Sequence, residues 1–123
     1  MKIRIKGNSI RYRLDKTDIE VLQELNKVEE MTHIGDHALH FCIRAREIPE
    51  SAIRMENNGV HLSVPLLQIT QWTTTDQVGF NLELPNPDGS ILKILVEKDF
   101  KCLTERDEDD SQAFDNPLAG ESC

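Results

Sequence analysis

The sequence predicts an α+β domain made of two ββαββ halves in one chain. Three observations indicate this class. Eight short segments alternate polar and apolar residues, two segments have apolar residues at helical spacing, and the order of elements repeats after about 50 residues. With 123 residues the chain is about one domain, and its aromatic content of 5% means that Ile, Leu and Val must supply most of the core.

The first segment predicts a β-hairpin over residues 2–14. Residues 2–6 and 10–14 alternate, with Ile3, Ile5, Ile10, Tyr12 and Leu14 on the apolar face. Gly7-Asn8 between them suits a two-residue turn, because glycine accepts a positive φ. The polar face of this hairpin carries Lys2, Arg4, Lys6, Arg11 and Arg13.

A helix and a second pair of strands complete the first half. Thr17 and Glu20 have capping-box spacing, and the apolar stripe Ile19, Leu22 and Leu25 predicts a helix over 17–26. Residues 28–45 then form two alternating segments around Gly35-Asp36, which predicts two strands joined by a turn.

The second half repeats this order. Residues 52–65 predict a hairpin that turns at Asn57-Asn58-Gly59, and 65–72 predict a short helix with Pro65 in its first turn. Residues 77–84 and 90–98 predict strands joined by the turn-rich segment 85–89.

A shift of 50 residues superposes the two halves. Ile10, Tyr12 and Leu14 fall on Val60, Leu62 and Val64, Leu22 falls on Trp72, and Val28 falls on Val78. With a few extra residues in the last turn, Phe41 and Ile43 fall near Ile94 and Val96. We therefore expect a tandem duplication, with halves 1–46 and 52–99 in a single domain spanning 1–103, because neither half is large enough to bury a core alone. Trp72 is expected to anchor the helix in that core.

The charge is concentrated at the two ends of the chain. The net charge is −8, yet residues 104–123 carry seven acids and one base, so the preceding residues are nearly neutral. This acidic tail has few large apolar residues and is expected to be disordered. Two roles stay open for it: a solubilising terminus, or a charged arm that binds a basic partner or the chain's own hairpin.

Short motifs in each half resemble the AbrB and MazE-like family. Gly7-Asn8-Ser9 matches the family's Gly-Asn-Ser, Arg13-Leu14 its Arg-aliphatic pair, and Val64-Pro65 its aliphatic-Pro pair. Asp15 stands where the first half would have the proline, and Ser63 where the second would have the arginine.

The resemblance implies a swapped-hairpin-like β-barrel with a pseudo-two-fold axis inside one chain. It also implies that basic residues of the first hairpin face DNA, with Arg13 at the family's reading position. Because Ser63 is the symmetric mate of Arg13, the basic surface is one-sided, which argues against palindrome reading but allows phosphate contacts.

The whole chain is also similar to a family of small uncharacterised bacterial proteins. The shared features are the opening "MKIRIKGNS", the stretch "VEKDF" before a cysteine, and an acidic tail containing "NP". This resemblance implies a bacterial origin and no known activity.

The hairpin is the candidate site, and the expected function is a non-enzymatic binding or regulatory module. It would contact nucleic acid or an acidic protein segment through Lys2, Arg4, Lys6, Asn8, Arg11 and Arg13. An alternative is that these cations only protect an edge strand against pairing with another chain.

The rival function is a small enzyme or metal-binding protein that uses His37, His40 and Cys42. On a strand only His40 and Cys42 share a face, and zinc usually needs four ligands, so this cluster is incomplete. The sequence has no phosphate-binding loop, dinucleotide fingerprint or nucleophile elbow. We therefore expect no metal and no cofactor, and we favour the binding module while the small enzyme stays open as the alternative.

Three further expectations concern location and assembly. No run of 18 apolar residues and no secretory signal is visible, so no membrane association is expected. Three irregularly spaced cysteines indicate a reducing cytoplasm. A pseudo-dimer already closed within one chain is expected to be a monomer.

Overall fold

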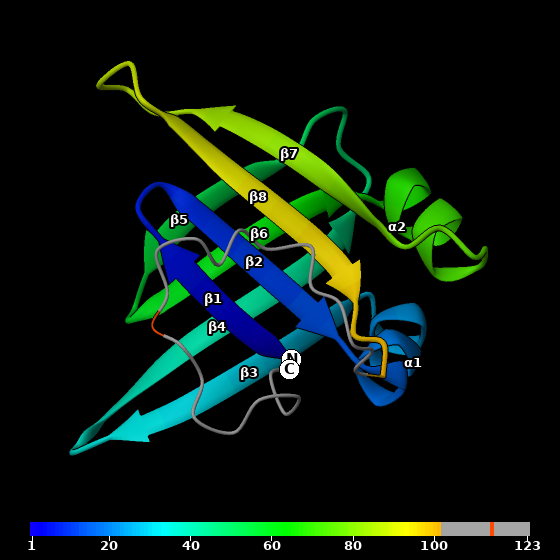
Figure 1. Ribbon diagram of the computed structural model, residues 1–123, viewed down its shortest axis with the longest axis horizontal. Helices are drawn as coiled ribbons and strands as arrows, with labels where there is room; N and C mark the ends of the chain where they lie inside the picture. The colour runs from blue at the N-terminus through cyan, green and yellow to red at the C-terminus, as the bar shows by residue number, and fades with distance from the viewer. Residues whose placement is uncertain (102–113, 115–123) are drawn as a thin grey trace.

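The computed structural model describes residues 1–101 and Phe114 (Figure 1). Its eight strands and two helices follow the predicted order. They are β1 (Lys2–Lys6), β2 (Ser9–Leu14), α1 (Lys16–Leu25), β3 (Lys27–Ile34), β4 (His37–Arg46), β5 (Ala52–Glu56), β6 (Gly59–Pro65), α2 (Leu66–Thr73), β7 (Gly79–Pro85) and β8 (Ile91–Lys98). The fold is therefore α+β, as predicted.

The strands form two four-stranded sheets that each combine hairpins from both halves. Sheet A has the order β1-β2-β8-β7 and sheet B the order β3-β4-β6-β5. In each sheet the two central strands are parallel and come from different halves, whereas the outer pairs are antiparallel hairpins. Sheet A lies in front of sheet B in Figure 1, and both helices lie at one end.

The expected β-barrel is wrong in one respect, because the sheets do not close. A closed barrel needs every edge strand to pair with a neighbour. In the described part of the chain β1 and β7 remain edges of sheet A, and β3 and β5 remain edges of sheet B. The arrangement is two stacked open sheets.

The two sheets have matching registers at their centres. In sheet A, Ile10 pairs with Ile94. In sheet B, Val60 pairs with Phe41. The 50-residue shift fails after the second helix, because Val78, the expected counterpart of the buried Val28, is 54% exposed and precedes β7. The strand pairing instead gives Val28 and Phe80 equivalent places, opposite Ile43 and Val96.

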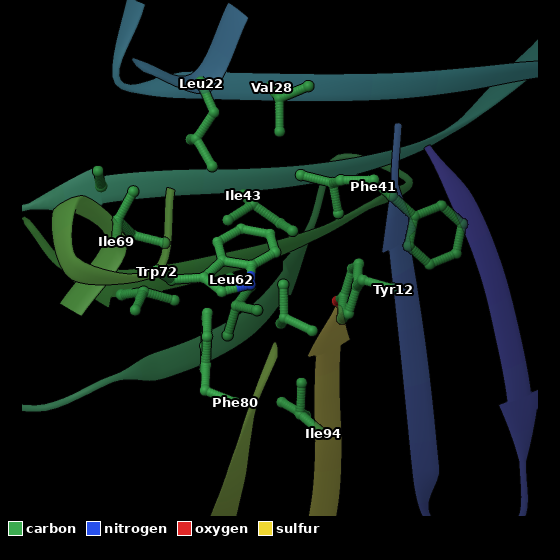
Figure 2. Packing of buried hydrophobic residues seen from close by; sticks show 14 of the residues in the cluster. Tyr12, Leu22, Val28, Phe41, Ile43, Leu62, Ile69, Trp72, Phe80 and Ile94 are labelled. Carbon is green, nitrogen blue, oxygen red and sulfur yellow. The ribbon is translucent and has the colours of Figure 1, made fainter. Parts of the chain in front are cut away.

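The core fills the space between the sheets (Figure 2). Trp72 is fully buried, packs edge-on against Phe80 with ring centroids 5.4 Å apart, and donates its Nε1 hydrogen to the carbonyl of Val78 over 3.1 Å. The predicted role of Trp72 as a core anchor is confirmed. Tyr12 is also fully buried, and its hydroxyl has no hydrogen-bond partner among the residues that the structure describes.

The first helix starts one residue earlier than expected and has a different cap. Asp15 is the N-cap: its side chain accepts from Asp18 N, and the Asp18 side chain accepts from Asp15 N in return. The carboxylates of this reciprocal pair replace the predicted Thr17–Glu20 box. The backbone hydrogen bond from Asp18 lowers the pKa of the Asp15 carboxyl.

The second hairpin turns one residue more tightly than expected. Asn57 and Asn58 both have positive φ, 51° and 60°, which is the requirement of a two-residue primed turn. Gly59 therefore begins β6 instead of belonging to the turn. Pro65 ends β6 and occupies the N-cap of α2, where it makes no side-chain cap hydrogen bond.

Two expectations fall partly outside the described residues. The expected domain boundary at 103 lies outside the described residues, and so does the expected disordered tail 104–123 apart from Phe114. The side chain of Phe114 is fully exposed. Among the described helices, none is long and apolar enough to cross a membrane.

Candidate functional site

The predicted basic residues gather on the outer face of sheet A. Because Ile3 pairs with the buried Tyr12, the alternating neighbours of both residues point away from the core. This places Lys2, Arg4, Lys6, Arg11 and Arg13 together on the outer face of sheet A, the sheet that lies in front in Figure 1. The exposed Asn8 lies in the turn, and its carbonyl accepts from Lys93 N over 2.9 Å.

An acidic residue of β8 lies among these cations. Arg11 Nε and Arg13 Nε both donate to Glu97 Oε1, over 2.7 and 2.9 Å. The side chains of Arg11 and Glu97 are only 19% and 14% exposed, so this contact is partly shielded from water. At the end of β8, Lys2 Nζ lies 2.9 Å from Asp99 Oδ2. The hairpin is therefore less strongly positive than its own sequence indicates.

The same face is hollowed beside this ion pair. A groove of about 430 Å³ extends over β2, β8 and β7. Its lining combines cations, carboxylates and apolar side chains: Ser9, Ile10, Arg11, Asn81, Leu82, Glu83, Lys93, Ile94, Leu95 and Glu97. Charged groups beside an apolar floor suit a ligand that carries both carboxylates and apolar side chains, because guanidinium groups bind carboxylates in a fixed planar geometry.

Sheet B has a different set of residues at the corresponding place. The halves place Gly59 and His61 at the positions of Ser9 and Arg11, and the register of the central strands places Cys42 opposite His61. Cys42 has no exposed surface, and burial raises the pKa of its thiol. A buried thiol of raised pKa is a poor nucleophile.

The structure brings together two of the three residues of the rival cluster. His40 and Cys42 are on the same face of β4, as predicted, while His37 is exposed beside Asp36, with 3.7 Å between His37 Nδ1 and Asp36 Oδ1. Across the described residues, no group of three or more His, Cys, Asp or Glu side chains is placed to hold a metal ion. His61 joins this face unpredicted, because its position depends on the parallel pairing of β4 with β6.

Glu29 of β3 completes the group on sheet B. Its Oε2 lies 2.7 Å from His40 Nε2, and its other oxygen contacts Lys27 Nζ. The hydrogen bonds from Lys27 and His40 lower the pKa of Glu29 to about 2. Glu29 is therefore ionised at neutral pH and accepts hydrogen bonds only.

A comparison with known proteins places the chain in a family. The model of the Family of unknown function (DUF7009) matches residues 1–118. The chain belongs to DUF7009. This confirms the predicted membership of an uncharacterised family, and the match extends well beyond β8 into the acidic tail. No similar curated protein and no similar solved structure was found, so the AbrB-like resemblance of this DUF7009 chain stays a prediction.

Proposed function

We propose that this DUF7009 protein is a non-enzymatic binding module whose outer face of sheet A holds an acidic protein segment. One observation supports this most strongly. Arg11 and Arg13 already converge on a single carboxylate, that of Glu97, on the wall of the groove. A carboxylate of a partner would be held by the same donors, either in place of Glu97 or beside it.

Edge protection does not account for these two arginines. Lys2, Arg4 and Lys6 belong to β1, which is an edge strand, and charged side chains there discourage pairing with another chain. Arg11 and Arg13 belong to β2, which is paired on both sides. Their side chains contact Glu97 on the wall of the groove, where a ligand could also reach them.

A protein segment fits the groove better than nucleic acid does. Glu83 and Glu97 line the groove and would repel phosphates and carboxylates alike, so the distinction rests on Leu95, which offers apolar surface that phosphates do not use. Nucleic-acid interfaces are strongly positive. A peptide with acidic and apolar residues can place each kind of side chain against a matching part of the lining.

We also propose that the two halves arose by duplication and exchange hairpins as in the AbrB-like arrangement. The support is the matching central registers of sheets A and B. In this proposal one chain supplies both halves, so the protein acts as a monomer, and the buried Cys42 thiol is compatible with the reducing cytoplasm expected from the sequence.

The test is a binding titration by fluorescence anisotropy with two probes. One is a labelled peptide that alternates aspartate and leucine, and the other is a single-stranded oligonucleotide of equal charge. The peptide should bind more tightly, and R11A and R13A should each weaken it, while K16A on the exposed start of α1 serves as the matched control. Tighter binding of the oligonucleotide would replace the protein partner with nucleic acid, and absence of binding to both would reject the module.

A further inference from the structure

The outward side chains of β8 form a row of changing character along the groove on sheet A. Ile94 and Val96 of this strand are buried, so Lys93, Leu95 and Glu97 point away from the core. All three line the groove. Successive members of the row are about 6.6–6.8 Å apart, because each residue of a strand advances the chain by about 3.3–3.4 Å.

The end of this row at Glu97 has more cations than anions. Arg13 is the register partner of Glu97 on the neighbouring strand, and Arg11 is one outward position away. Both guanidinium groups donate to Glu97 Oε1. Two cations therefore meet one carboxylate, which leaves a positive field for the carboxylate of a ligand.

The end of the row at Lys93 has the same excess. Lys93 is exposed, and its row across the sheet contains Ser9, Lys6 and the acidic Glu83. No ion pair joins Lys93 to Glu83 in the described part of the chain, although the two residues are register partners. Two cations again stand in a row with one carboxylate.

The middle of the row is apolar. Of the outward side chains in the paired stretches Ser9–Leu14 and Lys93–Lys98, only that of Leu95 is apolar, and it is half-buried. Asn81 lies opposite Leu95 on the edge strand β7, with an exposed side chain. Its amide offers a donor and an acceptor to the backbone of a bound segment.

This row gives the binding module a sequence preference. Resting on the function proposed above, we propose that the bound segment is extended and that every second residue reads acidic, apolar, acidic. In an extended chain these three side chains point the same way with the spacing of the row, so they meet Lys93, Leu95 and the pair of arginines together. The order is the same in both directions, so either chain direction satisfies it.

Two other kinds of segment do not fit this row. In a helix the side chains of residues i and i+2 do not share a face, so a helical segment would not present the pattern. Residues 104–123 contain no acidic residues that flank an apolar one at this spacing. The acidic tail therefore competes for the surface through its charge alone.

The test compares two labelled octapeptides of identical composition on the full-length protein. In Asp-Asp-Leu-Leu-Asp-Asp-Leu-Leu both faces of the extended chain carry the pattern, whereas Asp-Leu-Asp-Leu-Asp-Leu-Asp-Leu has one face of aspartates and one of leucines. Each methylene group that a leucine of the ligand buries against Leu95 is worth about fourfold in affinity. Fluorescence anisotropy below about 0.1 M salt should therefore show at least about fourfold tighter binding of the first peptide.

Variants locate the preference on the row. L95A should abolish the difference between the two peptides, because the apolar contact is then lost. K93A should weaken both by roughly 1.4- to fivefold, since both can place an aspartate there, and K16A on α1 should change neither. Equal or weaker binding of the first peptide to the wild type would overturn the pattern and leave the binding module standing. Absence of binding of both peptides would reject the module and the pattern with it.

Discussion

Arg11 and Glu97 are joined across the two central strands of sheet A, with Arg11 Nε donating to Glu97 Oε1 over 2.7 Å. The two residues come from opposite ends of the described chain and meet only because β2 and β8 pair in parallel. Arg13 shares the same oxygen. This contact ties the halves together and sets the charge of the proposed binding surface.

Removal of the Glu97 charge should strengthen binding of an acidic ligand. E97Q keeps an oxygen acceptor for Arg11 and Arg13 but removes one negative charge from the groove. Because partly exposed charges contribute roughly 0.2–1 kcal/mol, affinity for the aspartate–leucine peptide should rise roughly 1.4- to fivefold at low salt. Anisotropy titrations measure it. E56Q, which removes the partner of Arg54 on sheet B, is the control, and an unchanged or weaker affinity for E97Q would count against the surface.

The acidic tail is expected to compete with an acidic ligand for the same cations. Deletion of 104–123 removes a net charge of −6 and should raise affinity for polyanions below about 0.1 M salt, where screening is weak. Adding R11A and R13A to the truncated protein should abolish the gain. A gain that survives these two substitutions would show that the tail acts on another part of the protein.

Replacement of Tyr12 by phenylalanine is expected to stabilise the folded protein. Within the described part of the chain its buried hydroxyl has no hydrogen-bond partner, and burial raises the pKa of this phenol well above its ordinary value. An unpaired buried hydroxyl costs about 1–3 kcal/mol, so Y12F should raise the free energy of unfolding by about 1 kcal/mol. Urea denaturation measures the change, and Y12A, which leaves a cavity, should lower stability by about 3–5 kcal/mol. A loss of stability in Y12F would reveal a partner for the hydroxyl.

Glu29 should make part of the stability sensitive to acid. Its pKa is lowered to about 2 in the folded protein from 4.5, so its contribution is present above pH 4.5 and is lost as the pH falls toward 2. The amount is limited to roughly 0.2–1 kcal/mol because the carboxylate is largely exposed. Unfolding free energies between pH 7 and pH 2.5 should fall less steeply for E29Q than for the wild type. E24Q on the exposed side of α1 should follow the wild type, and identical slopes for E29Q and E24Q would contradict the pairing.

The sequence predicts local elements well because their causes are local. Alternation, helical spacing and the turn at Gly7-Asn8 identify all ten described elements to within a few residues. Asp15 is missed as a cap because Asp15 and Asp18 have the same three-residue spacing as Thr17 and Glu20, and both pairs suit a capping box. Asn57 and Asn58 show that a glycine next to a turn need not be part of it.

The residues of the candidate sites are brought together by long-range strand pairing, so the sequence predicts only some of them. The cations of the first hairpin follow from alternation, whereas Glu97 reaches them through the β2–β8 register. His61 similarly meets His40 through the β4–β6 register, which no short motif indicates. Whether the two sheets close into a barrel depends on whether their edge strands pair with each other. That pairing is set by the packing of the whole molecule, so local sequence patterns do not predict it.

Chemical-shift mapping tests most directly the central claim that the outer face of sheet A is the binding surface. The aspartate–leucine peptide is titrated into ¹⁵N-labelled full-length protein at low salt, and backbone amide shifts are followed residue by residue. The expected result is a saturable set of shifts centred on Arg11, Leu95 and Glu97, with Arg44 and His61 on sheet B unaffected. Shifts centred on sheet B, or no saturable shifts at all, would contradict the proposed surface.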